Sequence, residues 1–259
     1  MLVIPPGWKI ISKSKNPYDR VQVKCKDSKG RSQYIYHPLW PVLTGMLKFK
    51  RLCLFTRAIR KLGKCCDNDT DKLIKLMITT NIRVGSDKYA EDNETFGVCT
   101  LENTHVKKGV KDGDVVLCFC GKSGHRHEVN IHGENASFMK LKAREARNSG
   151  QKRLFPVGMA DRLRYRFKQL VGEDFNPKDI RTYSANVALI KNLRKEPGKN
   201  TKKELSAAIR RTSETMHHTP SVCKTNYICP QIMEFWLDHP EKIKEPRCNL
   251  HKLIKLLKI

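Results

Sequence analysis

The first 45 residues alternate between apolar and polar positions in the manner of short β-strands. Val21–Lys26 (VQVKCK) alternates regularly, and Gln33–Tyr36 is an aromatic segment with high β-propensity. Asp27–Gly30 (DSKG) lies between them and contains residues that favour turns. The pattern predicts a β-hairpin within a small β-rich region.

From Met46 onward, apolar residues recur every three or four positions, which predicts an α-helix with a basic outer face. A second helix is predicted over Asp71–Asn81. This change of period indicates a boundary, so we expect a small domain over residues 1–45 and a larger one over residues 46–259. The positions expected to face the core are Leu47, Phe49, Leu52, Phe55 and Ile59 in the first helix, and Leu73, Ile74, Met77 and Ile78 in the second.

Strand character returns between Gly97 and His132. Val115–Phe119 is an uninterrupted apolar run of the kind found in buried strands, and Gly121–Gly124 (GKSG) has the composition of a turn. Residues 137–155 are polar and basic, and we expect them to form a helical linker. This part of the chain therefore predicts a small β-hairpin region within the larger domain.

Capping patterns predict that helices dominate after residue 175. In Asn176–Asp179 (NPKD), Asn can cap a helix, Pro suits its first turn, and Asp faces the positive helix end. Thr201–Glu204 (TKKE) has the form of a capping box, and Thr219-Pro220 begins a third helix that carries Tyr227. The predicted fold class is α+β, with a small β-rich amino-terminal domain and a mainly α-helical larger domain. The buried stripe expected on the first of these helices is Ile180, Tyr183, Val187 and Ile190.

The charge balance points to the kind of partner. Lys and Arg number 51 against 26 Asp and Glu, so the net charge is +25, and the excess runs along the whole chain. Self-repulsion of this size disfavours a compact state, and a polyanionic partner offsets it. Nucleic acid is the leading candidate and a membrane surface the second. No window is as long as a membrane span, and the short basic segment His251–Ile259 (HKLIKLLKI) is equally suited to packing on the protein.

Cysteine spacing indicates a reducing compartment. The ten cysteines form no disulfide framework, since Cys65-Cys66 and the pair Cys118 and Cys120 are too close for ordinary bridges. Pro5-Pro6 interrupts any apolar run at the amino terminus, so we expect no signal peptide. We therefore expect an intracellular protein with free thiols.

Cleavage of a phosphodiester without a metal requires a nucleophile, cations on the non-bridging oxygens and an acid for the leaving 5′ oxygen. The sequence has no strong metal motif, but Tyr, Arg, Lys and His that suit these roles occur in four segments. In their order and spacing, these segments resemble type IB DNA topoisomerases of poxviruses, giant viruses and bacteria, and the resemblance covers roughly residues 4–240. The segments are Ile82–Gly85 with Asn93–Gly97, Phe119–Lys122, Lys178–Tyr183, and His218–Lys224 followed by Tyr227.

The resemblance implies a role for each matching residue. Tyr227 would be the nucleophile and form a 3′-phosphotyrosyl link. Arg83 and Arg181 would grip the non-bridging oxygens, because guanidinium groups match phosphate geometry and stay charged. His218 would donate a hydrogen bond to a phosphate oxygen. Since the phosphotyrosyl bond conserves the energy for rejoining, we expect that neither ATP, a metal ion nor any other cofactor is needed.

Two lysines complete the implied site. Lys122, at the tip of the predicted hairpin, would be the general acid for the leaving oxygen. Lys178 lies three residues before Arg181 on one helix face and would support the site. Taken alone, each residue has another explanation: Tyr227 as a core tyrosine, the arginines as surface residues, and Lys122 as a solvated turn lysine. The four segments in order favour the catalytic interpretation.

Other functions fit less well. A tyrosine recombinase uses the same chemistry but usually has a His at the position held here by Lys178, and a non-catalytic basic DNA-binding protein would not need the Tyr227 and Lys122 motifs. Gly121-Lys122-Ser123 resembles the end of a nucleotide-binding loop, but Val116 stands at the earlier glycine position. The residues that suggest zinc but lack the spacing of a standard site are His217, His218, Cys223 and Cys229.

The resemblance also implies a tyrosine-recombinase-like catalytic domain and a monomer that closes around double-stranded DNA, in a virion, a viral factory or a nucleus. The hairpin strand would lie against a DNA groove, and alternation puts Tyr34 and Tyr36 on the face opposite Gln33. An alternative is that both tyrosines are packing residues. Relatives usually have several tens of residues before the segment Ile4–Trp8 (IPPGW), so we expect a truncated small domain. The expected DNA contacts are Arg31, Gln33, Tyr34 and Tyr36.

Overall fold

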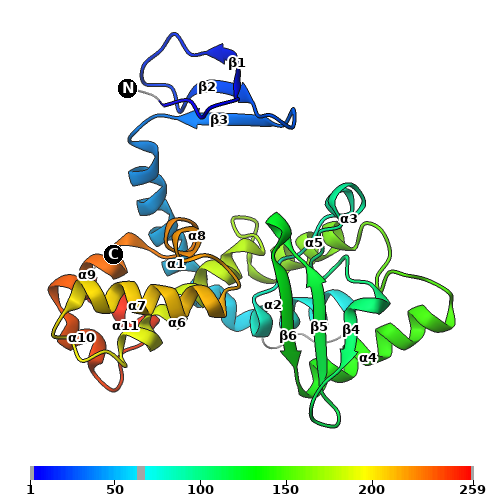
Figure 1. Cartoon of the computed structure of the whole chain (residues 1–259). Coiled ribbons are helices and arrows are strands. Elements are labelled where there is room, and N and C mark those ends of the chain that lie inside the picture. Colours follow the sequence, from blue (N-terminus) through cyan, green and yellow to red (C-terminus); the bar gives the residue numbers. More distant parts are fainter. Residues whose placement is uncertain (1–2, 63–67, 258–259) are drawn as a thin grey trace. The chain divides into compact units, whose positions relative to one another are not determined.

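The computed structural model describes residues 3–62 and 68–257, and the chain divides into two compact units, Met1–Phe49 and Lys50–Ile259. Helix α1 (Trp40–Leu62) crosses the boundary between them. The amino-terminal unit holds one three-stranded sheet, and the larger unit holds a second such sheet with most of the helices (Figure 1). The predicted α+β class is confirmed.

The amino-terminal sheet is antiparallel. Its strands, in spatial order, are β1 (Lys9–Lys13), β2 (Val21–Lys26) and β3 (Ser32–Tyr36). The predicted hairpin between β2 and β3 is confirmed. Alternation buries Val23 and Cys25 on one face and leaves Tyr34 and Tyr36 exposed. The two tyrosines are therefore not core residues of this unit.

Helix α1 begins six residues earlier than predicted, at Trp40 rather than Met46. Pro41 lies in its first turn, where the fixed φ of proline suits a helix. Leu47, which we expect to face the core, is 51% exposed. It lies about 200° around the helix from Phe49 and therefore points away from the buried stripe. That stripe consists of Phe49, Leu52, Phe55 and Leu62.

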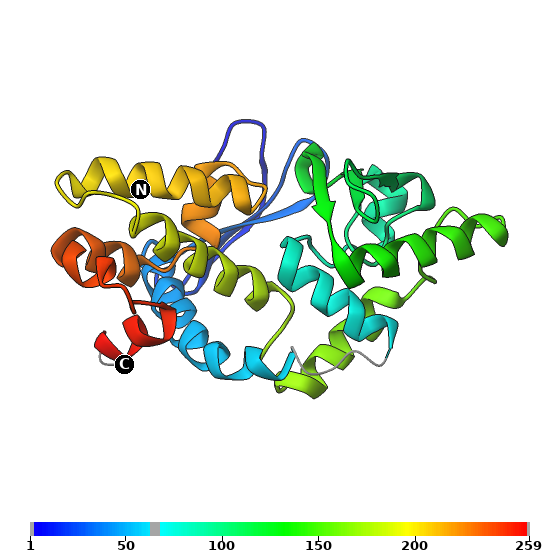
Figure 2. The same ribbon diagram turned by 90° about the horizontal axis from the view of Figure 1, so that it is seen from below.

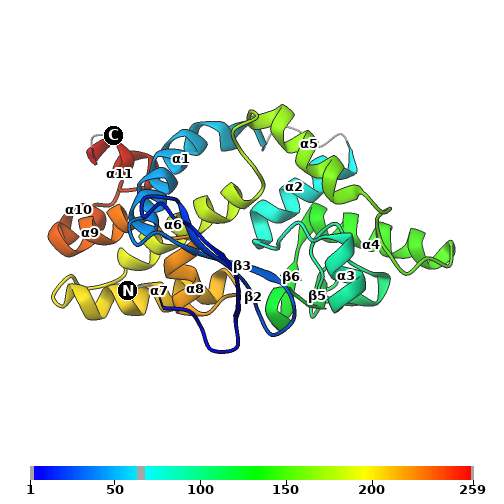
Figure 3. The same cartoon turned by 90° about the horizontal axis from the view of Figure 1, so that it is seen from above.

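The larger unit contains the second predicted hairpin, in an antiparallel sheet. Its elements are β4 (Val106–Lys108), β5 (Val115–Cys120), the 3-10 turn η2 (Lys122–Gly124) and β6 (Arg126–Ile131), flanked by α2 (Asp69–Thr80), α4 (Gly133–Asn148) and α5 (Met159–Val171). The spatial order is β4-β5-β6, and the buried β5 is confirmed. Helix α4 packs on the sheet, and α2 packs on both α4 and α5 (Figures 2 and 3). Their buried side chains form the main hydrophobic core of this unit.

The segment predicted as a helical linker is instead part of the core. Helix α4 starts at Gly133 and ends at Asn148, earlier than the predicted range of 137–155. The helix is polar on average but has one apolar stripe. Composition does not reveal this stripe, because most of its residues are small alanines. The buried positions are Ala136, Phe138, Met139, Ala143 and Ala146.

Helices form most of the remainder, as predicted. They are α6 (Lys178–Leu193), α7 (Thr201–Thr215), α8 (Pro220–Asn226), α9 (Pro230–Asp238), α10 (Pro240–Lys244) and α11 (Leu250–Leu256); the short α3 (Asp87–Asn93) and η1 (Asn103–His105) precede β4. In α6, Ile180 and Ile190 are buried as expected, but Val187 is exposed. Asn186 and Leu189 face the interior in its place.

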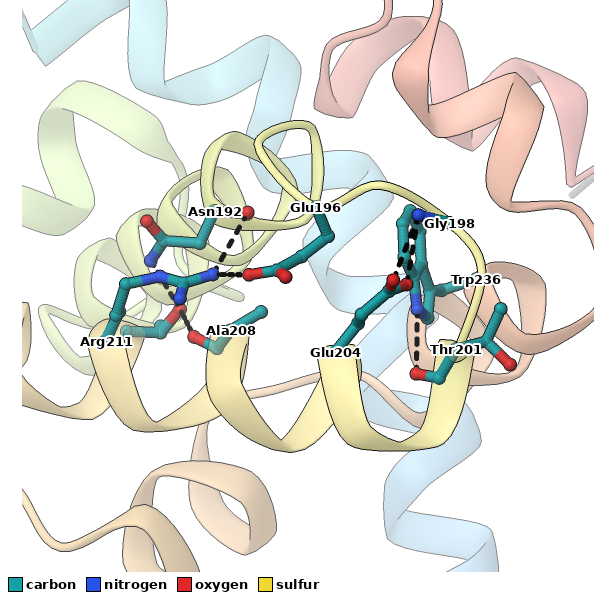
Figure 4. A network of polar contacts seen from close by, with 9 residues as sticks. Asn192, Glu196, Gly198, Thr201, Glu204, Ala208, Arg211 and Trp236 are labelled. Carbon is teal, nitrogen blue, oxygen red and sulfur yellow. Dashed lines mark hydrogen bonds and ion pairs between the residues drawn. The ribbon is translucent and has the colours of Figure 1, made fainter.

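The start of α7 differs from the predicted capping box by one residue. Asn200, not Thr201, caps the helix by accepting from the Lys203 N–H. The Glu204 carboxylate then accepts from the backbone N–H of Gly198 (Figure 4). It also accepts from the N–H groups of Lys199 and of Asn200 itself, and it is buried there. This arrangement fixes the turn between α6, which carries Lys178 and Arg181, and α7, which leads to His218.

The described cysteines are not paired with one another, while Cys65 and Cys66 lie outside the described residues. Within residues 3–62 and 68–257, no helix is long and apolar enough to cross a membrane. The amphipathic carboxyl-terminal segment forms α11, in which Leu250, Leu253 and Ile254 are buried against the protein.

Candidate active site

Four side chains from distant parts of the sequence meet at one place in the larger unit. The Tyr227 hydroxyl accepts hydrogen bonds from Nη2 of Arg83, at 3.4 Å, and from Nε of Arg181, at 3.3 Å. Nη2 of Arg83 and Nη2 of Arg181 also lie 3.0 and 2.6 Å from Nε2 of His218. The His218 ring stacks on the Tyr227 ring with centroids 5.1 Å apart. A phenol, an imidazole and two guanidinium groups thus form one cluster.

Arg83 is held by a close approach of two chain segments. The Val98 N–H donates to the Arg83 carbonyl at 2.8 Å. A Cβ added at Gly97 would lie only 2.5 Å from that carbonyl oxygen, and one added at Gly85, where φ is +91°, would lie 2.7 Å from Thr100 Oγ1. Both positions therefore require glycine, which explains the spacing of the first sequence segment.

Arg181 is 2% exposed and lies in the first turn of α6. Two residues earlier, Asp179 accepts from both Nε and Nη2 of Arg51 at 2.7 Å and from the Asn176 N–H at 2.8 Å. These bonds fix the helix start. Nη2 of Arg181 also donates to the Met216 carbonyl, whereas Nη1 is buried and has no hydrogen-bond partner among the described residues.

His218 follows a Schellman motif at the end of α7. The His218 N–H donates to the Ser213 carbonyl and the His217 N–H to the Glu214 carbonyl, and His217 takes the left-handed conformation with φ of +54°. Glycine is the usual residue at that position. Thr219 then caps α8, its side chain accepting from the Val222 N–H. The sharp turn sets His218 between two helices.

Tyr227 is the C-cap of α8 and is 5% exposed. The buried Asn186 amide holds its segment: Nδ2 donates to the Tyr227 carbonyl at 2.9 Å, and Oδ1 accepts from the Cys229 N–H at 3.0 Å. The sequence alone assigns no role to Asn186 or to the Arg51–Asp179 pair. An Asn in a helix interior is a local signal for such a role, because its propensity is poor there. The ion pair spans 128 residues and has no local signal.

Comparisons with known proteins agree with this geometry. The family model for the catalytic core of eukaryotic DNA topoisomerase I matches residues 57–254, a range that contains all four side chains. The chain is 30% identical over 288 residues to DNA topoisomerase 1B of Acanthamoeba polyphaga mimivirus, a match that covers 99% of this chain and 85% of that protein. This chain belongs to the type IB DNA topoisomerases. It is also 28% identical over 230 residues to DNA topoisomerase I of monkeypox virus, with 82% and 71% coverage, and 28% identical over 247 residues to DNA topoisomerase 1 of rabbit fibroma virus, with 89% and 77% coverage.

The predicted family and enzyme class are therefore confirmed, and DNA is the substrate. Membership of the type IB topoisomerases decides against the recombinase and the non-catalytic DNA-binding protein as alternatives. The local electrostatics bear on the chemistry of each side chain in the cluster.

The surroundings of Tyr227 make its phenol more acidic than an ordinary tyrosine. Burial alone raises the pKa of Tyr227, but the charges of Arg181 and Arg83 and their hydrogen bonds outweigh it, so the pKa is lowered overall. Burial and the same two arginines lower the pKa of His218 to about 3. The imidazole is therefore neutral at physiological pH.

The neutral state of His218 has a geometric consequence. Guanidinium nitrogens are donors only, so Nε2 of His218 accepts from Arg83 and Arg181 in this arrangement and carries no proton. Donation from Nε2 to a phosphate oxygen requires the proton to move to that nitrogen. A phosphate that draws the arginines to its own oxygens would release Nε2 for this role.

The two lysines are not part of the cluster. Lys122 is exposed in η2, and Lys178 is exposed at the start of α6. The hydrogen bonds described for the cluster do not include either of them. The hairpin nevertheless comes close, because the charge of His125, three residues after Lys122, contributes to lowering the pKa of His218.

The expected DNA contacts in the amino-terminal unit fall into two pairs. Arg31 and Gln33 both donate to the Asp27 carboxylate, at 2.8 and 2.9 Å, and so are bound to their own turn. Tyr34 and Tyr36 instead line an open hollow of about 520 Å³ together with Lys24. Its lining residues are Asp19, Arg20, Val21, Lys24, Tyr34 and Tyr36.

Proposed function

We propose that this topoisomerase relaxes DNA by transient breakage of one strand, with Tyr227 as the nucleophile. The Tyr227 oxygen attacks the phosphorus, the P–O5′ bond breaks, and the strand is held as a 3′-phosphotyrosyl ester until the 5′ hydroxyl reverses the reaction. The observation that carries the proposal is the Tyr227 hydroxyl within 3.4 Å of donors from both Arg83 and Arg181. No fuel is required because the ester conserves the bond energy.

The phosphate is proposed to bind at the two arginines. Nη1 of Arg181 is buried without a partner among the described residues, and a non-bridging oxygen satisfies it. Arg83 neutralises the second oxygen, and His218 donates once its Nε2 is protonated. This arrangement stabilises the charge of the pentavalent transition state with groups that are already in place.

The proton for the leaving oxygen is proposed to come from Lys122. Its exposed position on the hairpin turn leaves it able to reach into a groove of bound DNA, and an ammonium suits the leaving 5′ oxygen. Lys178, exposed three residues before Arg181, supports the site by offsetting phosphate charge. Catalysis is proposed to need neither a metal ion nor ATP.

The small amino-terminal domain is proposed to contact the DNA. Tyr34 and Tyr36 are exposed on the sheet face that carries Lys24, which suits contacts to sugar, phosphate or a thymine methyl. Arg31 and Gln33 shape the adjoining turn through Asp27 and reach DNA only if those bonds exchange. We further propose a monomer that closes around the duplex and acts in a virion, a viral factory or a nucleus.

The test is relaxation of supercoiled plasmid in EDTA without ATP. The protein should relax the plasmid, and Tyr227→Phe should bind DNA but form no covalent adduct, because it loses only the hydroxyl. Tyr165→Phe, at an exposed tyrosine of α5, is the matched control and should relax normally. Normal relaxation by Tyr227→Phe would refute the assignment of the nucleophile, and strict dependence on magnesium would refute metal independence.

A further inference from the structure

A column of five rings leads from the β-sheet of the larger unit to the catalytic cluster. Phe96 contacts His105 with ring centroids 4.4 Å apart, and His105 lies 6.2 Å from Phe119. Phe119 stacks on His127 at 4.8 Å with ring planes only 3° apart, and His127 lies 5.1 Å from His217. His217 is the neighbour of His218. The column therefore joins the hairpin that bears Lys122 to the turn that bears His218.

His127 occupies the critical place in this column. It lies on β6 opposite Phe119 and is 4% exposed. Its Nδ1 is buried without a hydrogen-bond partner among the described residues, so the ring is not held by that nitrogen. Burial, together with His217 and the two arginines, lowers the pKa of His127 to about 4, and the ring is neutral. Because the ring is neutral and stacked on Phe119, His127 affects its neighbours through packing and not through charge.

The other edge of the His127 ring faces the residue before Lys122. A Cβ added at Gly121 would lie 2.4 Å from Nε2 and 2.6 Å from Cδ2 of His127. Gly121 is tied at the same point by its N–H, which donates to the His125 carbonyl at 2.7 Å. The backbone from which the Lys122 side chain extends is therefore seated directly against this ring.

His217 also contacts the His127 ring. It holds the left-handed position of the Schellman motif, where glycine would avoid the steric cost that a side chain bears. The imidazole at this position packs against His127 instead. The contact between the two rings thus connects two loops that carry different catalytic groups.

We propose that His127 is a positioning residue that sets the Lys122 hairpin against the arginine and tyrosine cluster, because its ring contacts both Gly121 and His217. His127 makes no described hydrogen bond to Tyr227, Arg83 or Arg181, so it acts through these neighbours and not on the DNA. The inference rests on the proposed role of Lys122 as general acid.

The experiment compares two leaving groups. A nicked duplex is built around a cleavage site mapped for this protein, with either the normal 5′ oxygen or a 5′-bridging sulfur, whose departure needs little protonation. Misplacement of the acid by His127→Ala should slow single-turnover cleavage of the oxygen substrate by about 10- to 100-fold and that of the sulfur substrate by less than about threefold. His127→Phe retains a ring against Phe119 and should stay within about fivefold of the original protein on both substrates.

A second perturbation tests the contact itself. Gly121→Ala should reproduce the oxygen-specific defect, because its Cβ displaces the ring or the turn. In the His127→Ala background the same Cβ fits the vacated space, so the double variant should be no slower than His127→Ala. Additive defects would overturn the proposed contact, whether or not either single variant loses stability, which urea unfolding monitors in parallel.

Lys122→Ala separates the inference from the proposed function. If sulfur rescues Lys122→Ala but not His127→Ala, Lys122 is the acid and His127 does not position it. If sulfur rescues neither, the general-acid assignment itself fails, and the positioning role fails with it. Equal slowing of both substrates by His127→Ala and His127→Phe would also overturn the inference, because a defect shared by both leaving groups does not lie in the delivery of the proton.

Discussion

The two sides of the reacting phosphodiester are prepared to very different degrees. On the nucleophile side, Tyr227, Arg181 and His218 contact one another, and buried hydrogen bonds fix their backbones. On the leaving-group side, Lys122 stands exposed on a turn, outside these contacts. The column of five rings joins the second side to the first through the contact of His127 with His217. Under the proposed mechanism, attack is therefore organised within the protein, whereas delivery of the proton to the leaving oxygen depends on how the hairpin meets the DNA.

The largest effect on the cleavage rate should come from a change on the leaving-group side. Lys122→Ala should slow cleavage of normal DNA by about 10² to 10⁴-fold, because a 5′ alkoxide is a poor leaving group without an acid. The nucleophile side should be unaffected, so the pKa of Tyr227, measured by NMR of labelled tyrosine, should not move. A shift of that pKa in Lys122→Ala would show that the two sides are coupled before DNA binds.

Arg181→Lys should have the next largest effect. It should slow cleavage by about 10² to 10³-fold at saturating DNA, because an ammonium cannot reproduce three directed guanidinium contacts. It should also raise the pKa of Tyr227, since the charge and the hydrogen bond of Arg181 lower it now. Arg162→Lys, on the exposed face of α5, serves as the control. A variant with normal cleavage would exclude Arg181 from the transition state.

Asn186→Leu tests whether the nucleophile side is fixed from within. The change keeps the branched shape of the side chain but removes the hydrogen bonds to the Tyr227 carbonyl and the Cys229 N–H. Urea unfolding should show a loss of about 1–3 kcal/mol in the free energy of unfolding. Cleavage should also slow, by about tenfold, through misplacement of the phenol. The control is Asn226→Ala, at an exposed Asn of α8, which should change neither the stability nor the cleavage rate. Unchanged stability of Asn186→Leu would mean that the hydrogen bonds of Asn186 to the Tyr227 segment are dispensable.

The smallest effect concerns pH. The pKa values of His127, His217 and His218 are all lowered, chiefly by burial. The unfolded chain therefore binds protons first as pH falls below about 6.5, and stability should decrease from there toward pH 4. After allowance for the partial exposure of His217 and His218, the loss between pH 7.5 and pH 5 should be roughly 1–3 kcal/mol. Unfolding in urea across this range measures it.

The variant His127→Phe should make the decrease with pH shallower, because one buried titrating ring is removed. His239→Gln, at a largely exposed histidine, should leave the slope unchanged. A free energy of unfolding that does not vary between pH 7.5 and 5 would show that the cluster accepts protons as readily as the unfolded chain.

Local patterns predicted what local physics determines. Alternation around Asp27–Gly30 gave the hairpin, and Thr219-Pro220 gave the start of α8, because a turn or a cap depends on neighbours in the sequence. The convergence of Arg83, Arg181, His218 and Tyr227 was accessible only through the family resemblance. Their spacing along the chain contains nothing that brings them within 3.4 Å of one another.

The failures have equally physical reasons. The linker assigned to residues 137–155 overlooked a stripe of alanines, whose burial depends on the sheet they pack against. Val187 was assigned to the core from periodicity alone, although Asn186 takes the interior position to bind the chain around Tyr227. The pair of Arg51 and Asp179 could not be inferred, since each is an ordinary charged residue until the fold brings them together.

Helix α6 also determines where the chain tolerates a change of length. Arg181 and Asn186 lie on it, and an α-helix turns by about 100° and advances by about 1.5 Å with every residue. One residue inserted between them would rotate Arg181 relative to Asn186. Either the guanidinium would turn away from the phenol, or Asn186 would lose its hydrogen bonds to the chain around Tyr227. The turn that follows α6, with its buried Glu204, is short and tightly bonded. We therefore expect relatives to vary in length outside residues 181–227. A deletion within residues 181–227 would move the side chains after it out of position relative to those before it.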